Sequence, residues 1–164
     1  MAAKEQQGEN TPSLLDRLID NEPRNRDVRQ EPAKSLRQLK AGLRRDLEWL
    51  LNARRPPVDL PEGAGELERS VFYYGLPDVS SLSLNSVTDQ RLLVRVIETA
   101  VAAFEPRLTG VRVSLQPVNR NTQTMRFQIE GMFRIDPAPE RVTFDTTLEL
   151  ISGEYEVEGE RSAG

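Results

Sequence analysis

Phe104-Glu105-Pro106-Arg107-Leu108 marks the point at which a strongly periodic helix must end and a region of strands begins. Upstream of it, apolar residues recur with the spacing of one helical face at positions 92, 93, 96, 97, 100, 101 and 104. Pro106 has no backbone N–H and disfavours a helical conformation of the residue before it. The sequence therefore predicts that the helix ends at about Phe104.

The carboxylate of Glu105 then falls at the carboxyl end of that helix, where the helix dipole disfavours a negative charge by about 0.3–1 kcal/mol. Arg107 follows closely and is a local source of compensating charge. Alternatively, Glu105 and Arg107 bind an external partner. The residues themselves leave both interpretations open.

The composition excludes several classes of site. The 164 residues contain no Cys and no His, which removes disulfides, thiolate nucleophiles, histidine general bases and zinc sites built on either residue. The sequence has neither a glycine-rich phosphate loop nor a metal-spaced array of carboxylates, so we expect no cofactor and no metal. The polar start of the chain and the lack of a long apolar run favour a cytoplasmic protein.

Charge is unevenly distributed along the chain, although the net charge is only −4. Residues 24–55 carry ten Lys/Arg against four Asp/Glu, whereas residues 130–160 carry nine Asp/Glu against two Arg. Such polarity favours oriented packing against other proteins. Nucleic-acid binding by the basic region is the alternative, but a solvated helix face explains the pattern more simply in an acidic protein.

Residues 1–34 are predicted to lie outside the main domain. A polar tail is followed by a short amphipathic helix from Ser13 to Asp20 and then by a charged linker. The apolar face of this helix consists of Leu14, Leu15, Leu18 and Ile19. The helix either folds back onto the core or docks in the groove of a partner.

Residues 35–164 are predicted to form one α+β domain, with N-terminal helices packed on one face of a C-terminal antiparallel β-sheet. We expect helices over about 35–55, 66–74 and 86–104. Leu67, Val71 and Tyr74 share one side of the second, which Gly75 follows, and Ser86 caps the third. From residue 111 the apolar period changes to two, which predicts a sheet of three to four strands.

The last expected strand and the turn at Glu105 are the candidate sites. In that strand Tyr155 and Val157 share one face and three glutamates share the other, which indicates either protection of a sheet edge or an edge that accepts a partner's strand. Glu105 lies between apolar neighbours, as the acid of a glycosidase does. However, Arg107 would hold it in the charged form, and the sequence places no second carboxylate, so catalysis is disfavoured.

Four stretches occur in an order that resembles TssE, the baseplate subunit of type VI secretion systems, which is similar to the small wedge protein of contractile phage tails. They are Ser13-Leu14-Leu15-Asp16-Arg17-Leu18, residues 47–55, Tyr74-Gly75-Leu76-Pro77-Asp78, and the helix ending Phe104-Glu105-Pro106-Arg107-Leu108. The resemblance extends from Ser13 to about Val157.

The resemblance implies a non-catalytic structural role in a cytoplasmic baseplate docked to the inner-membrane complex. It implies contacts with the wedge subunits TssF and TssG, in which Glu105, Pro106 and Arg107 act in wedge assembly. It also implies that the terminal strands, with Tyr155 and Val157, nucleate the TssB/TssC sheath by strand exchange. The phage relatives' lysozyme-like label leaves a muralytic glycosidase as one alternative, and a stand-alone protein-binding adaptor of the same fold is another.

Overall fold

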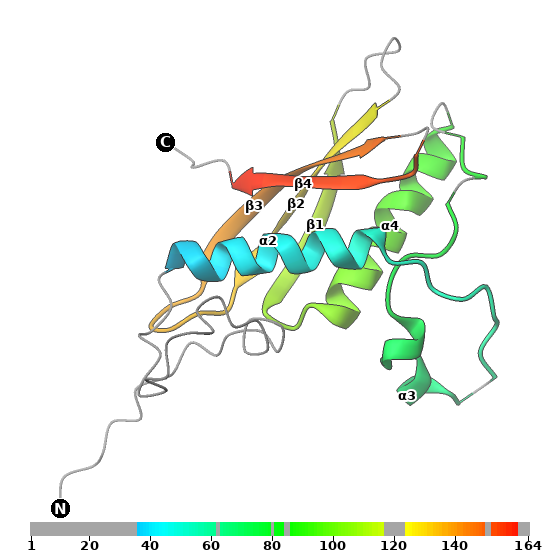
Figure 1. Cartoon of the computed structure of the whole chain (residues 1–164), viewed down its shortest axis with the longest axis horizontal. Helices are drawn as coiled ribbons and strands as arrows, with labels where there is room; N and C mark the ends of the chain where they lie inside the picture. The colour runs from blue at the N-terminus through cyan, green and yellow to red at the C-terminus, as the bar shows by residue number, and fades with distance from the viewer. Residues whose placement is uncertain are drawn as a thin grey trace, which may run out of the picture.

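The computed structural model describes residues 36–61, 63–79, 81–83, 86–116, 124–149 and 152–160. The predicted tail, amphipathic helix and linker lie outside these residues, and with them Leu14, Leu15, Leu18 and Ile19. Within the described residues the chain runs from a long helix, through a loop-rich segment, to a second long helix and then to a sheet (Figure 1).

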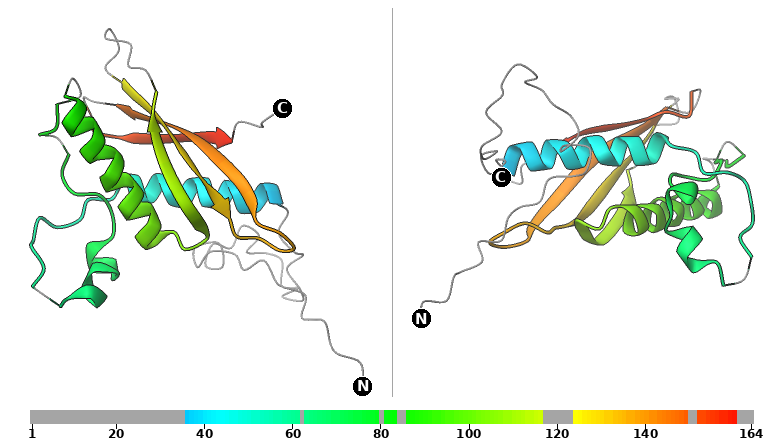
Figure 2. Two further views of the ribbon diagram at one scale, coloured as in Figure 1. Left: turned by 180° about the vertical axis from the view of Figure 1, so that it is seen from behind. Right: turned by 60° about the horizontal axis from the view of Figure 1, so that its bottom comes forward.

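The long helices α2 and α4 lie on the same face of the sheet (Figures 1 and 2). The helical elements are α2 (Leu36–Asn52), α3 (Gly65–Glu68), the 3-10 turn η1 (Val71–Tyr73) and α4 (Val87–Phe104). This arrangement confirms the predicted α+β class, with helices first and the sheet last.

In the described residues the sheet has four antiparallel strands in the order β1-β2-β3-β4. The strands are β1 (Leu108–Leu115), β2 (Thr124–Phe133), β3 (Glu140–Glu149) and β4 (Tyr155–Glu160). Because side chains alternate between the two faces of a strand, the period-two pattern places one set of apolar residues beneath the helices. Central examples are Phe127, Ile129 and Phe144, all nearly inaccessible to solvent.

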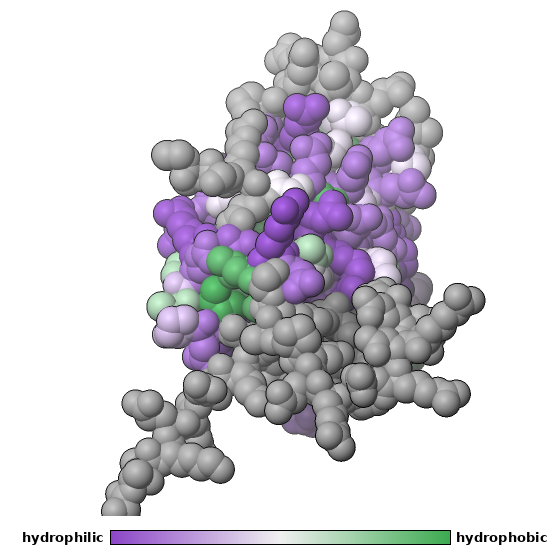
Figure 3. All heavy atoms as spheres, turned by 60° about the vertical axis from the view of Figure 1, so that its left-hand side comes forward, coloured by the Kyte–Doolittle hydropathy of each residue, from purple (hydrophilic) through white to green (hydrophobic). Residues whose placement is uncertain are grey.

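The core lies between this face and the two helices. α2 contributes a leucine stripe that includes Leu43, Leu47 and Leu51, and α4 contributes Leu93, Ile97 and Val101. Burying one such side chain is worth about 1.5–3 kcal/mol, so the spacing of apolar residues fixes which face of each helix meets the sheet. The coloured residues in Figure 3 are mostly hydrophilic on this side of the molecule, apart from one small apolar area.

The ends of α4 follow the local signals in the sequence. Ser86 accepts a hydrogen bond at its Oγ from the backbone N–H of Asp89 at 3.3 Å, which caps the first turn. Phe104 is the last helical residue, as Pro106 predicts.

The predicted helix over 66–74 is wrong: the segment forms α3 and η1 instead. A short helix needs a buried face to be stable, and Val71, which was expected on that face, is 90% exposed. Gly75 does adopt a positive φ, at +108°, and it lets the chain pass very close to the end of α2. A Cβ at Gly75 would lie 2.5 Å from the carbonyl oxygen of Ala53. Directly after it, the N–H of Leu76 donates to that same carbonyl at 2.9 Å.

Candidate functional site

The turn between α4 and β1 is held in place by backbone hydrogen bonds at Glu105 and at Arg107. The N–H of Glu105 donates to the carbonyl of Val101 at 2.9 Å and completes the helix. The carbonyl of Arg107 accepts from the N–H of Arg134 at 2.8 Å, which ties the turn to the chain just beyond β2. Pro106 lies exposed between them.

Within this turn, Arg107 and Glu105 form the local contact that the sequence predicts. The Arg107 Nε donates to Glu105 Oε1 at 2.7 Å, and its Nη2 donates to Oε2, so the guanidinium grips both carboxylate oxygens. The Arg107 backbone N–H also donates to Oε1, at 3.1 Å. Glu105 is only 5% exposed. A two-pronged charge-assisted contact of this kind is both stronger and more directional than a single hydrogen bond.

A third member of the cluster comes from α2 and was not predicted. The Arg107 Nη2 also donates to Asp46 Oδ2 at 2.7 Å, and Asp46 Oδ1 accepts from Arg45 Nη2 at 2.8 Å. The Arg45 guanidinium in turn lies 5.3 Å from the ring centre of Trp49. The four charged groups therefore join the α4–β1 turn to the middle of α2, and the exposed Trp49 lies next to them.

The position of Asp46 carries a weak sequence signal. It lies three residues after Leu43 and four before Leu50, at the border of the buried stripe of a helix that is otherwise rich in basic residues. When the leucine stripe packs against the sheet, a carboxylate at its border loses part of its hydration and needs a cation as partner. The identity of that cation, far away in the sequence, follows only from the packing of α2 against the turn.

The cluster also changes the ionisation of its surroundings. Burial alone would lower the pKa of Arg107, but hydrogen bonds and charge from Glu105 and then Asp46 outweigh it, so that pKa is raised. Burial, followed by the charges of Asp46 and Glu105, raises the pKa of Tyr74. The Tyr74 ring packs edge-on against Phe104 with centres 5.3 Å apart. Arg107 therefore stays charged and Tyr74 stays neutral at physiological pH.

This geometry suits a fixed polar anchor better than a catalytic acid. A general acid presents its proton to a substrate, whereas both oxygens of Glu105 accept hydrogen bonds from Arg107. The turn offers a partner the ring of Pro106 and the outer part of Arg107, whose side chain is 21% exposed. Arginine and aromatic side chains at such positions are typical of protein interfaces.

The other candidate residues, Tyr155 and Val157, lie on β4 and contact a different part of α2. Their side chains point into the core and are 2% and 0% exposed. The Tyr155 ring packs edge-on against Phe127 at 5.9 Å. A partner can therefore reach these residues through their backbone and not through their side chains.

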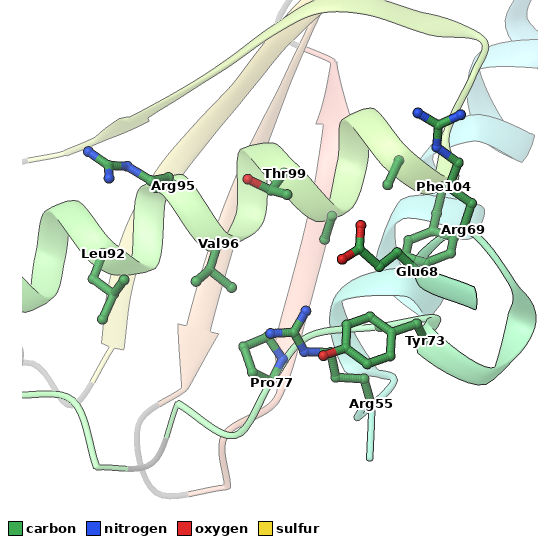
Figure 4. A pocket seen from close by; sticks show the side chains of 13 residues that line it. Arg55, Glu68, Arg69, Tyr73, Pro77, Leu92, Arg95, Val96, Thr99 and Phe104 are labelled. Carbon is green, nitrogen blue, oxygen red and sulfur yellow. The ribbon is translucent and has the colours of Figure 1, made fainter. Parts of the chain in front are cut away.

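A pocket of about 490 Å³ lies on the outer side of α4 (Figure 4). Leu92, Val96 and Thr99 of α4 line one side of it, and Arg55 and Tyr73 line the other. The Arg55 guanidinium lies 4.6 Å from the ring centre of Tyr73. The charged residues that line the pocket are three arginines and one glutamate, namely Arg55, Arg69, Arg95 and Glu68. This lining is net positive and would favour an acidic group over a cation.

Comparison with known protein families identifies the family to which the chain belongs. A family model described as the baseplate wedge protein gp25 matches residues 37–138, more than half of the 164-residue chain. The chain belongs to this family. The match to gp25 includes α2, α4, the Glu105–Arg107 turn and the first two strands, and it ends just before β3. No curated protein and no solved structure matches the chain.

Membership of the gp25 family confirms the predicted baseplate resemblance and indicates a structural role in a phage-tail-like baseplate. It also indicates interaction with other baseplate components. Among the described helices, none has the length and apolar character needed to cross a membrane.

Proposed function

We propose that this gp25-family chain is the TssE-type subunit of a type VI secretion baseplate. In this role it joins the wedge subunits TssF and TssG, and it nucleates the TssB/TssC sheath by strand exchange. The baseplate would assemble in the cytoplasm on the inner-membrane complex. The family match supports the baseplate part of this proposal, and the resemblance of the sequence motifs supports the type VI part.

The Glu105–Arg107–Asp46 cluster is the observation that carries the wedge contact. Both carboxylates are nearly buried, while Arg107 and Pro106 keep an open side. Because the turn is already tied to α2 and to the end of β2, a partner that docks on it has little conformational entropy to remove. A preorganised anchor of this kind is what a subunit that must orient its neighbours needs.

Two further contacts complete the proposal. The N-terminal segment with Leu14, Leu15, Leu18 and Ile19 would dock as an amphipathic helix in a groove of a wedge partner. β4 would pair through its backbone with an extended segment of a sheath subunit, because it is the last strand in the sheet order.

The wedge contact can be tested at Pro106, which is exposed and is not one of the hydrogen-bonded groups of the cluster. Pro106→Glu adds a charge on the exposed ring position, and Pro139→Glu adds the same charge at an exposed proline between β2 and β3. Each full-length variant is co-purified with TssF and TssG, and circular dichroism checks its fold. We expect Pro106→Glu to lose the wedge subunits and Pro139→Glu to retain them.

Retention of TssF and TssG by a folded Pro106→Glu variant would remove the turn from the interface and overturn the proposed wedge contact. The size of the purified complex distinguishes the baseplate subunit from a stand-alone adaptor. An adaptor would form a small complex with one partner, whereas a baseplate subunit would form a multi-subunit wedge.

A further inference from the structure

The outer edge of β4 is hydrogen-bonded by a side chain of α2. The N–H of Tyr155 donates to Asn52 Oδ1 at 2.9 Å, and the carbonyl of Tyr155 accepts from Asn52 Nδ2 at 2.8 Å. One amide group thus pairs with both backbone groups of one strand residue. A residue of a neighbouring antiparallel strand would offer the same donor and acceptor.

Two arginines extend this pattern along the same edge. Arg54 Nη2 donates to the carbonyl of Gly153 at 2.8 Å, and Arg44 Nη1 donates to the carbonyl of Val157 at 3.2 Å. The carbonyl of Glu154, between them, faces the other way, since it accepts from the N–H of Glu149 in β3 at 2.8 Å. Side chains of α2 and of the residues just after it therefore occupy the positions where an added strand would bind.

The helix itself is fixed by its buried leucines, whereas the Asn52 side chain is held only by hydrogen bonds: the two to Tyr155 and one from its Nδ2 to the carbonyl of Glu48 at 2.9 Å. The leucines of α2 next to this edge are buried in the core, with Leu47 and Leu51 both 0% exposed. Asn52 is the last residue of α2, and its side chain is solvent-exposed. Rotation about its side-chain bonds would break both hydrogen bonds to Tyr155, and the last turn of α2 would then move aside for an added strand while the buried leucines hold the rest of the helix.

We propose that Asn52 is a gate on the β4 edge. In the isolated subunit its amide closes the edge, and an extended partner segment joins β4 only by replacing the Asn52 amide at Tyr155. The inference rests on the proposed function, in that the segment is the one a sheath subunit contributes. It adds the residue that controls the pairing and the register position at which pairing begins.

Such a gate solves a problem of exposed edges. A free edge strand pairs readily with a second copy of the same chain, which leads to aggregation. A single side-chain amide satisfies the backbone and prevents this pairing, yet a full strand, which brings several hydrogen bonds at once, can displace it.

The test uses the full-length chain with Asn52→Ala, which removes both hydrogen bonds to Tyr155. Glu48→Ala, one turn earlier on α2, is the matched control. Asn52→Asp keeps the acceptor for the Tyr155 N–H but loses the donor to its carbonyl. Hydrogen exchange at the Tyr155 amide is measured by NMR, binding to the TssB–TssC heterodimer by calorimetry, and self-association by sedimentation.

We expect the Tyr155 amide to exchange about tenfold faster in Asn52→Ala, which corresponds to the loss of a typical hydrogen bond. Sheath affinity should rise by a similar factor, with Asn52→Asp between wild type and Asn52→Ala, and Glu48→Ala should match wild type in both measurements.

Unchanged exchange at Tyr155 would overturn the gate. Equal sheath binding by wild type and Asn52→Ala would also overturn it, while leaving strand exchange in place. If neither wild type nor Asn52→Ala binds the sheath subunits, the proposed function fails instead. The gate is then tested by self-association, measured by sedimentation. Asn52→Ala should then associate through its opened edge, and a variant that stays monomeric would refute the gate.

Discussion

Replacing Arg107 by Met removes the cation shared by the buried Glu105 and the partly buried Asp46, and of the two only Asp46 keeps a second arginine, Arg45. The side chains of Glu105 and Asp46 are 6% and 12% exposed, and that of Arg107 is 21% exposed. Breaking a fully buried ion pair by deleting one partner costs about 3–5 kcal/mol, because the other charge is left without compensation. Since Arg107 keeps some contact with water, we expect Arg107→Met to lower the free energy of unfolding by about 2–4 kcal/mol at pH 7. Urea unfolding followed by circular dichroism at pH 7 measures this loss of stability.

Arg141→Met provides the matched control. Arg141 also pairs with a carboxylate, Glu130, at 2.7 Å, but its side chain is 72% exposed. Exposed pairs contribute little, so this variant should lose less than about 0.5 kcal/mol. If Arg107→Met costs no more than Arg141→Met, the view of the cluster as a buried electrostatic brace is refuted.

Three further predictions concern the fold. Gly75→Ala should lower the free energy of unfolding by about 2–4 kcal/mol, because a Cβ there requires a strained φ and collides with Ala53; urea unfolding tests this, and a loss below 1 kcal/mol would contradict it. Tyr155→Phe should stabilise the protein by about 1 kcal/mol at pH 7, since the buried Tyr155 hydroxyl has no hydrogen-bond partner among the described residues; a clear loss in thermal unfolding would argue against this. Burial raises the pKa of Tyr155 from 10.0 to about 12, so the stability this group contributes is complete below pH 10 and is lost as pH rises to 12. Wild type should therefore lose about 3 kcal/mol more than Tyr155→Phe over this range in alkaline unfolding, and parallel curves would exclude it.

Features that depend on neighbours in the sequence were predictable. The end of α4 at Phe104 follows from the covalent geometry of Pro106, and its start follows from the capping oxygen of Ser86. The alternation of apolar residues in β2 and β3 sets which face is buried, so the layer arrangement was also accessible. The contact of Arg107 with Glu105 belongs to this class, because the two residues lie within one turn.

Features that depend on packing were not predictable in the same way. The apolar spacing at 67, 71 and 74 suggested a helical face, but only the packed core shows that nothing covers Val71 there. Asp46 meets a cation 61 residues away, and Asn52 meets a strand 103 residues away. The sequence contains many arginines that could pair with Asp46, and no periodic pattern in it indicates that the partner is Arg107.

Asp46 and Asn52 also show why α2 matters beyond its leucine stripe. The two residues are six positions apart, so at about 100° per residue they project from different sides of the helix. One braces the turn on which the wedge contact is proposed, and the other closes the strand edge on which the sheath contact is proposed. Because the same buried leucines fix both, α2 sets the geometry of one proposed interface relative to the other. For a subunit whose family role is to join neighbours in a baseplate, that relative geometry is the property on which function depends.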